Sequence, residues 1–190
     1  MGGVVHTIFI NMVPVVKTYQ RNNFFMQKTM TQLPEIKLVG ITCRTNNAHQ
    51  FESDPSTNKI AATVQKYFHN ALAEKILQRK NPGTTYCVYT NYESDYTGDY
   101  TYFIGEAVSS VEKVSEGFET LTIPAQHYSK FTNHPGPMPA VCIDMWQNIW
   151  AMTPSDLSGE RAYIADFEVY DERSVDHNNV TLDIYIGIRK

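Results

Sequence analysis

The chain has 190 residues, 42% of them hydrophobic and 19% charged, as expected for one globular domain or for one domain built from two similar halves. Its 16 Lys and Arg against 20 Asp and Glu give a net charge of −4, and no basic run occurs, which argues against a nucleic-acid-binding protein. A mildly acidic protein instead attracts cations. The histidines and cysteines show no metal-binding spacing, so we expect no metal and no cofactor.

The N-terminal segment is predicted to lie outside the domain. Its apolar stretch, residues 4–16, is too short to span a membrane, and it lacks the basic start of a signal peptide. We therefore interpret residues 1–27 as a tail or extension and residues 28–190 as the folded domain, with no membrane association. The separated cysteines Cys43, Cys87 and Cys142 predict reduced thiols in a cytoplasmic protein.

The first half of the domain reads as strand, helix, strand, strand. A strand is expected over residues 36–45, followed by a loop over residues 46–57. Apolar residues at helical spacing predict a helix from residue 58 to about residue 79. Two strands follow, over residues 84–92 and 100–108, joined by a polar turn.

The second half repeats this order. After a short strand over residues 118–123 come a strand at 127–132, a helix at 141–152, and strands at 161–170 and 180–189. Phe103-Ile104-Gly105 corresponds to Tyr185-Ile186-Gly187, which indicates an internal repeat.

The predicted fold is therefore α+β, with duplicated strand–helix–strand–strand units (residues 28–109 and 118–190) and helices packed on an antiparallel sheet. Duplicated units of this kind leave a central groove between the halves, where a ligand cleft is expected. The alternative is that side chains fill the groove and that it has no function.

Strand alternation singles out Glu168, a carboxylate in mid-strand between Phe167 and Val169. In the last strand Leu182, Ile184, Ile186 and Ile188 are expected to face the helix. Tyr185 would then face the groove and, by the repeat, so would Phe103. Glu168 has two interpretations: a carboxylate on a solvated outer face, or a desolvated anchor that a bound cation would stabilise.

Two tryptophans, Trp146 and Trp150, lie one turn apart on the second predicted helix. They flank the apolar stripe that starts at Val141. Helical aromatic residues are most often part of the core, but these two could also form one wall of the groove.

These residues carry a resemblance to a known family. The matching segments are 86–95, 100–105, 146–150, 165–171 and 183–188. With these five blocks in order, residues 28–190 resemble the GyrI-like effector-binding domains, and most closely the stand-alone, integron-associated type. The ligand domains of AraC-type and MerR-type multidrug-responsive activators are similar.

The resemblance implies a pseudo-twofold domain whose central cleft takes lipophilic, cationic, aromatic compounds. Glu168 matches the glutamate that commonly lies on the floor of such a cleft. The candidate wall residues are Tyr170, Tyr185, Trp146, Trp150, Phe103 and Tyr92. Residues 1–27 have no room for a helix-turn-helix segment, so we expect no direct nucleic-acid binding.

The predicted function is that of a small-molecule binding protein, a sensor or sequestering protein without its own DNA-binding domain. One alternative is a GyrI-like hydrolase of reactive cyclopropanoid compounds, in which Glu168 acts as general base with help from Trp150. The sequence shows no Ser/His/Asp set and no GxSxG motif, so an enzyme is the less favoured interpretation. The other alternative is a protein-interaction module, such as a gyrase inhibitor.

Overall fold

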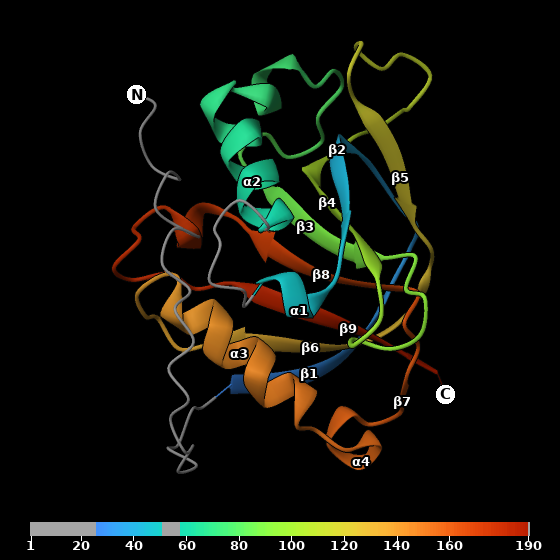
Figure 1. Ribbon diagram of the computed structural model, residues 1–190, viewed down its shortest axis with the longest axis vertical. Coiled ribbons are helices and arrows are strands. Elements are labelled where there is room, and N and C mark those ends of the chain that lie inside the picture. Colours follow the sequence, from blue (N-terminus) through green and yellow to red (C-terminus); the bar gives the residue numbers. More distant parts are fainter. Residues whose placement is uncertain (1–25, 51–57, 190) are drawn as a thin grey trace.

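A computed structural model of the chain describes residues 26–50 and 58–189. These residues form an α+β fold with one nine-stranded antiparallel sheet and a few helices, as predicted (Figure 1). The strands are β1 (Met26–Leu33), β2 (Ile36–Thr45), β3 (Thr85–Thr90), β4 (Tyr100–Ala107), β5 (Glu119–Ile123), β6 (Gln126–Asn133), β7 (Glu160–Arg161), β8 (Ala165–Tyr170) and β9 (Asp183–Arg189). The helices are α1 (Asn47–Gln50), α2 (Lys59–His69), α3 (Ala140–Trp150) and α4 (Pro154–Leu157), with 3-10 turns η2 (Leu72–Lys75) and η3 (Glu172–Ser174).

The sheet confirms the internal repeat. Its strand order is β1-β6-β9-β8-β3-β4-β2-β5, with β7 also paired to β9. The unit β2-α2-β3-β4 recurs as β6-α3-β8-β9, and the halves meet where β3 pairs with β8. The strand that precedes each unit pairs with the other half: β1 pairs with β6, and β5 pairs with β2. This exchange of first strands ties the halves into one continuous sheet.

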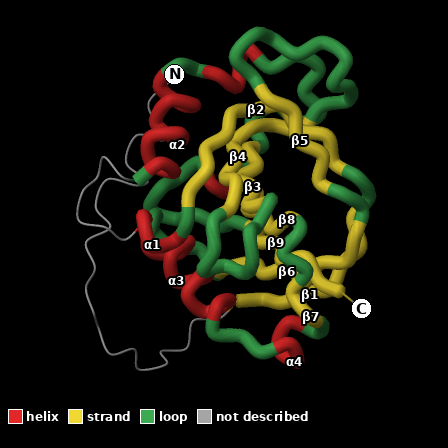
Figure 2. Tube along the Cα trace, turned by 45° about the vertical axis from the view of Figure 1, so that its right-hand side comes forward, coloured by secondary structure: helices red, strands yellow, loops and turns green. Residues whose placement is uncertain are grey.

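The two long helices lie on the same side of a curved sheet, α2 over the first half and α3 over the second (Figures 1 and 2). Helix α2 begins after Asn58, whose side chain accepts a hydrogen bond from the Ala61 backbone N–H at 2.9 Å, a normal N-cap. The predicted helix to residue 79 is wrong. Helix α2 ends at His69, because Ala71 adopts a left-handed conformation (φ 47°) and a short 3-10 turn follows.

Helix α3 packs as its apolar spacing predicts. Val141, Met145 and Ile149 are buried against β6 and β9, together with Leu182, just before β9, and the inward row of β9 itself: Ile184, Ile186 and Ile188. Each fully buried aliphatic side chain stabilises the fold by about 1.5–3 kcal/mol. The prediction that this β9 row faces the helix is confirmed.

Strand β1 is not among the predicted elements. Its sequence is mainly polar, because it lies at the edge of the sheet and most of its side chains are exposed. Lys28 on this strand donates to the backbone oxygen of Asp156 and, at 2.9 Å, to the Ser158 hydroxyl, which connects β1 to α4. Residues 1–25 of the predicted tail lie outside the described residues. Helix α1 lies within the loop predicted for residues 46–57.

A separate apolar core fills the opposite side of the sheet. It contains Phe103, Phe167 and Tyr128, all fully buried, and residues of both edge regions pack against it. On this side Gly40 lies directly opposite Gly105, and a Cβ on either would come within 2.0–2.2 Å of a backbone oxygen. Only glycine allows β2 and β4 to approach this closely.

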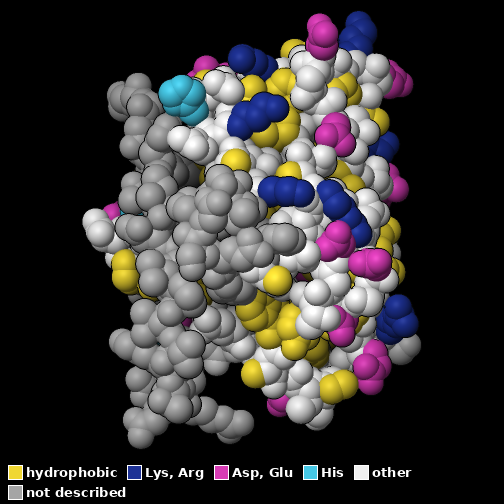
Figure 3. Space-filling model, viewed as in Figure 1, with side chains coloured by type: hydrophobic (Ala, Val, Ile, Leu, Met, Phe, Trp, Pro, Cys, Tyr) yellow, Lys and Arg dark blue, Asp and Glu magenta, His cyan; other side chains and the backbone are white. Residues whose placement is uncertain are grey.

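Basic and acidic side chains are interspersed on the face in Figure 3, where the described residues are visible, rather than gathered in one basic patch. Among the described residues no helix has the length and apolar character needed to cross a membrane.

Candidate functional site

The register of the central strands places Glu168 under the two helices. Residues that lie directly opposite each other across neighbouring strands project from the same face of a sheet. One such cross-strand series, the helix-side row, consists of Phe131, Ile184, Glu168, Cys87, Ile104 and Ile41. Glu168 is the one ionisable carboxylate in this otherwise apolar row.

Three donors converge on the Glu168 carboxylate, which belongs to a residue that is 2% exposed. The Trp146 indole Nε1–H donates to Oε1 at 2.5 Å, and the Tyr89 hydroxyl donates to the same oxygen at 2.8 Å. The Tyr170 hydroxyl donates to Oε2 at 2.8 Å, and the Cys142 Sγ lies 3.6 Å from Oε1. We call these five residues the Glu168 cluster.

The Glu168 cluster lies where the two halves of the repeat meet, at the β3–β8 pair. Cys87 and Glu168 face each other across the β3–β8 pair, and Tyr89 and Tyr170 each follow two residues later on their own strands. The two tyrosines are thus equivalent positions of the repeat, and both donate to the same carboxylate. The carboxylate itself has no counterpart, because the equivalent position is the buried thiol of Cys87.

The electrostatic state of Glu168 reflects two opposed effects. Burial raises the pKa of the carboxyl, because an ionised group loses hydration there, whereas hydrogen bonds from Trp146, Tyr89 and Tyr170 lower it. Burial prevails, so the pKa lies above its ordinary value. Among the described residues no Lys, Arg or His forms an ion pair with this carboxylate. An added cation would therefore meet a negative charge without a cationic partner from that part of the chain.

Aromatic rings extend the cluster toward the surface. The Tyr89 ring packs edge-on against Trp146 at 5.0 Å between centroids, and Trp146 lies 6.2 Å from Trp150. Trp150 in turn stacks on Tyr96, with an interplanar angle of 8°. Trp146 is 7% exposed, whereas Tyr96 and Trp150 are half-buried. The rings come from both halves, since Tyr96 belongs to the β3–β4 connection and Trp150 to α3.

The structure does not bring Phe103 and Tyr185 to Glu168. They lie in the adjacent cross-strand series, with Phe167 between them, on the opposite face of the sheet. Tyr185 stacks on Phe167 at 4.6 Å and 11°, and the Lys130 ammonium already lies over the Tyr185 ring at 5.6 Å. The predicted grouping of these two residues with Glu168 is therefore corrected. Both faces of the central strands bury apolar residues, so alternation alone does not identify the helix side.

The other predicted residues fall into two groups. Trp146 and Tyr170 contact Glu168 directly, and Trp150 contacts Trp146. Tyr92 lies on the helix side, but its hydroxyl donates to Asp166 at 3.0 Å.

Sequence reasoning missed Tyr89 and Cys142 as site residues. Alignment of Cys87-Val88-Tyr89 with Glu168-Val169-Tyr170 would have identified Tyr89 as the equivalent of Tyr170.

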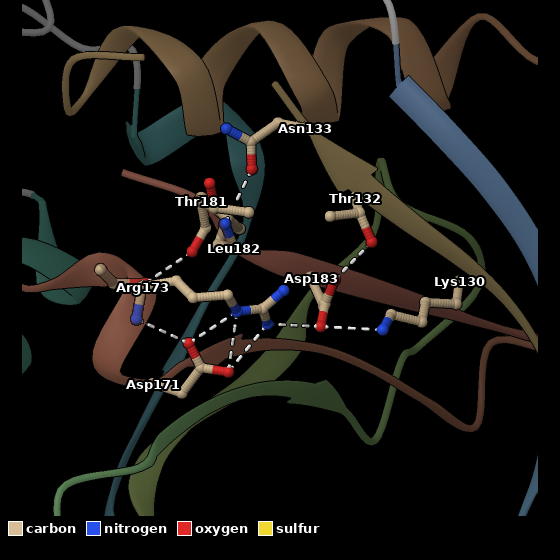
Figure 4. A network of polar contacts seen from close by, with 9 residues as sticks. Lys130, Thr132, Asn133, Asp171, Arg173, Thr181, Leu182 and Asp183 are labelled. Carbon is tan, nitrogen blue, oxygen red and sulfur yellow. Dashed lines mark hydrogen bonds and ion pairs between the residues drawn. The ribbon is translucent and has the colours of Figure 1, made fainter. Parts of the chain in front are cut away.

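The opposite face carries its own buried carboxylate, Asp183, with a different environment (Figure 4). Lys130 Nζ lies 3.0 Å from Asp183 Oδ2, Arg173 Nη2 donates to the same oxygen at 2.8 Å, and the Thr132 hydroxyl donates to Oδ1. Burial raises the pKa of Asp183, but these partners outweigh it and hold the pKa below its ordinary value. Two protein cations already neutralise Asp183, so this face offers no comparable anchor there.

No group of three or more His, Cys, Asp or Glu side chains in the described ranges could hold a metal ion. Cys43, Cys87 and Cys142 are all free thiols, and burial raises the pKa of each.

Comparison with known proteins gives a consistent assignment. A sequence model of one family, Cass2, the integron-associated effector binding proteins, matches residues 29–188. The solved integron cassette protein VCH_CASS2 from Vibrio cholerae is 31% identical, with a TM-score of 0.69 over 88% of this chain and 100% of its own. The Bacillus subtilis protein YobU, named as a candidate transcriptional regulator, is 25% identical over 85% of this chain and 97% of its own.

A more distant structure, SAV2435 bound to tetraphenylphosphonium, is 16% identical. It has a TM-score of 0.69 over 86% of this chain and 94% of its own, and so shares the fold.

Proposed function

The chain belongs to the Cass2 family of integron-associated effector-binding proteins, and we propose that it binds small lipophilic cations with aromatic groups at the Glu168 cluster. One observation carries this proposal: a buried carboxylate without a cationic partner among the described residues, bordered by aromatic rings from both halves. A bound cation would balance the charge, and the rings would add cation–π attraction of about 0.5–2 kcal/mol each. The role would be that of a cytoplasmic sensor or sequestering protein.

Two further observations support the proposed ligand class and location. The structure of SAV2435, which shares the fold, has tetraphenylphosphonium bound, a lipophilic aromatic cation. The free cysteines of this chain suit the reducing interior of a cell. At 16% identity that neighbour establishes the fold alone, and the Glu168 carboxylate and its aromatic neighbours in this chain support the ligand class.

The test compares tetraphenylphosphonium with neutral triphenylphosphine oxide by isothermal titration calorimetry and thermal unfolding. A ligand present at 100 times its Kd stabilises the folded state by about 2.7 kcal/mol, or roughly 5–10 °C for a protein of this size. In Glu168→Gln the cation loses its anchor. For charges about 5 Å apart at an effective dielectric of about 20, the loss is about 3 kcal/mol, or roughly a hundredfold in Kd.

The matched control is Asp183→Asn, which makes the same carboxyl-to-amide change on the neighbouring strand but on the opposite face. It should leave the Kd of the cation unchanged. Equal losses of cation and neutral affinity in Glu168→Gln would contradict the anchor role, as would absence of cation binding by the unmodified protein.

A further inference from the structure

A second buried carboxylate, Asp166, lies two residues before Glu168 on β8. Alternate residues of a strand share a face and lie about 7 Å apart, so both acids border the same region under the helices. Asp166 is fully buried; its Oδ1 accepts the Gly187 backbone N–H at 2.8 Å, and its Oδ2 accepts the Tyr92 hydroxyl at 3.0 Å. Unless something neutralises Asp166, the region holds two negative charges.

Arg161 neutralises Asp166. Its Nη2 and Nε donate to Asp166 Oδ2 at 2.8 and 3.1 Å, and its side chain is 7% exposed. Burial lowers the pKa of Arg161, but the neighbouring Asp166 outweighs this effect and the pKa is raised overall, so the guanidinium stays charged. The pair is therefore a closed ion pair rather than a surface contact.

The Arg161 guanidinium also uses the aromatic surface next to Glu168. Its Cζ lies 4.6 Å from the Tyr163 ring centroid, 6.0 Å from that of Tyr92 and 5.9 Å from that of Trp146. Trp146 joins the two acids, because its ring contacts Arg161 while its indole N–H donates to Glu168. One acid is thus paired internally with a cation on aromatic rings, and the other is left without such a partner.

We propose that Arg161 determines which ligand charge the site prefers. By neutralising Asp166 it leaves Glu168 as the one unbalanced carboxylate of the pair, so the site selects aromatic monocations over dications. This inference rests on the proposed function of the Glu168 cluster. A ligand with two positive charges would place the second one near Arg161, where it meets repulsion and where Asp166 is already paired. Without Arg161 the second charge would have Asp166 as its partner.

The experiment uses two nearly isosteric two-ring cations, N-methyl-4-phenylpyridinium with one charge and 1,1′-dimethyl-4,4′-bipyridinium with two. Their Kd values are measured by calorimetry at pH 8, with tetraphenylphosphonium as the reference ligand. The variants are Arg161→Met, Asp166→Asn and the double variant, which removes both charges.

The unmodified protein should prefer the monocation. In Arg161→Met the ratio of the dication Kd to the monocation Kd should fall at least about tenfold, since two unit charges about 7 Å apart at an effective dielectric of about 20 change a binding constant by roughly fiftyfold. Asp166→Asn leaves Arg161 unpaired, so both cations should weaken and the dication more. The double variant should restore the original ratio.

If the ratio of the dication Kd to the monocation Kd is unchanged in folded Arg161→Met, the inference is overturned. It is also overturned if the double variant keeps the ratio of Arg161→Met, because packing rather than charge would then explain the change. If Arg161→Met does not fold, Asp166→Asn decides, and unchanged Kd values there overturn the inference. If the unmodified protein binds tetraphenylphosphonium but neither of the two-ring cations, this inference is overturned while the proposed function stands. Binding of no cation at all overturns the proposed function as well.

Discussion

Replacing Glu168 by glutamine removes a buried charge without changing the size of the side chain. Hydrogen bonds to an ionised group contribute about 1.5–3 kcal/mol each, and three donors surround Glu168, so they favour the carboxylate by several kcal/mol. Desolvation of the ion costs a similar amount. Because the pKa of Glu168 is raised, burial outweighs the donors, and the charge destabilises the ligand-free fold. We expect Glu168→Gln to be more stable at pH 8 by about 1–2 kcal/mol, or roughly 2–8 °C.

The sign of the pH dependence follows from the direction of the shift. With its pKa raised in the folded state, Glu168 binds its proton more tightly there than in the unfolded chain. The destabilisation of the fold by the Glu168 charge is therefore absent below the pKa of the unfolded chain, about 4.3, and complete above the pKa in the folded state. Urea unfolding between pH 4.5 and pH 8 should show the stabilities of Glu168→Gln and the unmodified protein diverging as the pH rises.

Asp183→Asn is the control variant, and its effect on the stability of the fold should have the opposite sign. The lowered pKa of Asp183 means that its charge stabilises the fold above the unfolded pKa, near 3.9, and that this contribution is lost on acidification. The variant should be less stable at pH 8 by about 1–3 kcal/mol, with the difference narrowing toward low pH. If Glu168→Gln instead loses more than about 1 kcal/mol at pH 8, the three donors outweigh burial and the carboxylate stabilises the fold, which would refute the reasoning.

Two further predictions follow from single contacts. Trp146→Phe removes the 2.5 Å donor and should raise the pKa of Glu168 further, so cation affinity should be lost at a higher pH than in the unmodified protein; identical pH profiles in calorimetry would contradict this. Gly105→Ala would place a Cβ 2.2 Å from the Val39 backbone oxygen and should cost about 3 kcal/mol in urea unfolding. In the control Gly136→Ala, the new Cβ would lie 3.6 Å from its nearest neighbour, the Val141 Cβ, and the substitution should cost less than about 1 kcal/mol. Equal costs would show that the β2–β4 approach does not require glycine.

The fold was largely predictable because its information is local and repeated. The apolar rows of β9 and α3 have clear periods, and the repeat supplied the order of the elements. Two features had no such signal. Strand β1 is polar because it occupies an edge, and the end of α2 depends on the left-handed conformation of Ala71, a residue that ordinarily favours helix.

The site was predictable only in part, for a physical reason. Glu168 stands out in sequence because a carboxylate in mid-strand among apolar residues is unusual. Its neighbours depend on register, and a strand buried on both faces gives no indication of which side a given residue faces. The sequence therefore predicts Phe103 and Tyr185 beside Glu168, although they belong to the other core. The pairing of Arg161 with Asp166 joins β7 to β8 through a turn whose geometry the sequence does not show.

The duplicated scaffold gives Glu168 its partners, and a departure from symmetry keeps it a single charge. The repeat places one tyrosine from each half, Tyr89 and Tyr170, on the same carboxylate. A second acid at the equivalent position, Cys87, would lie directly across the β3–β8 pair at cross-strand distance, about 5 Å. Two carboxylates that close share a proton rather than both ionising, so a symmetric site would gain little charge and lose its clear preference for a cation. A buried thiol at Cys87 avoids that competition, and Arg161 has the corresponding effect along the strand by neutralising Asp166. Among the buried carboxylates of the described residues, only Glu168 is thus left without a cationic partner, which is what the proposed selection of singly charged ligands requires.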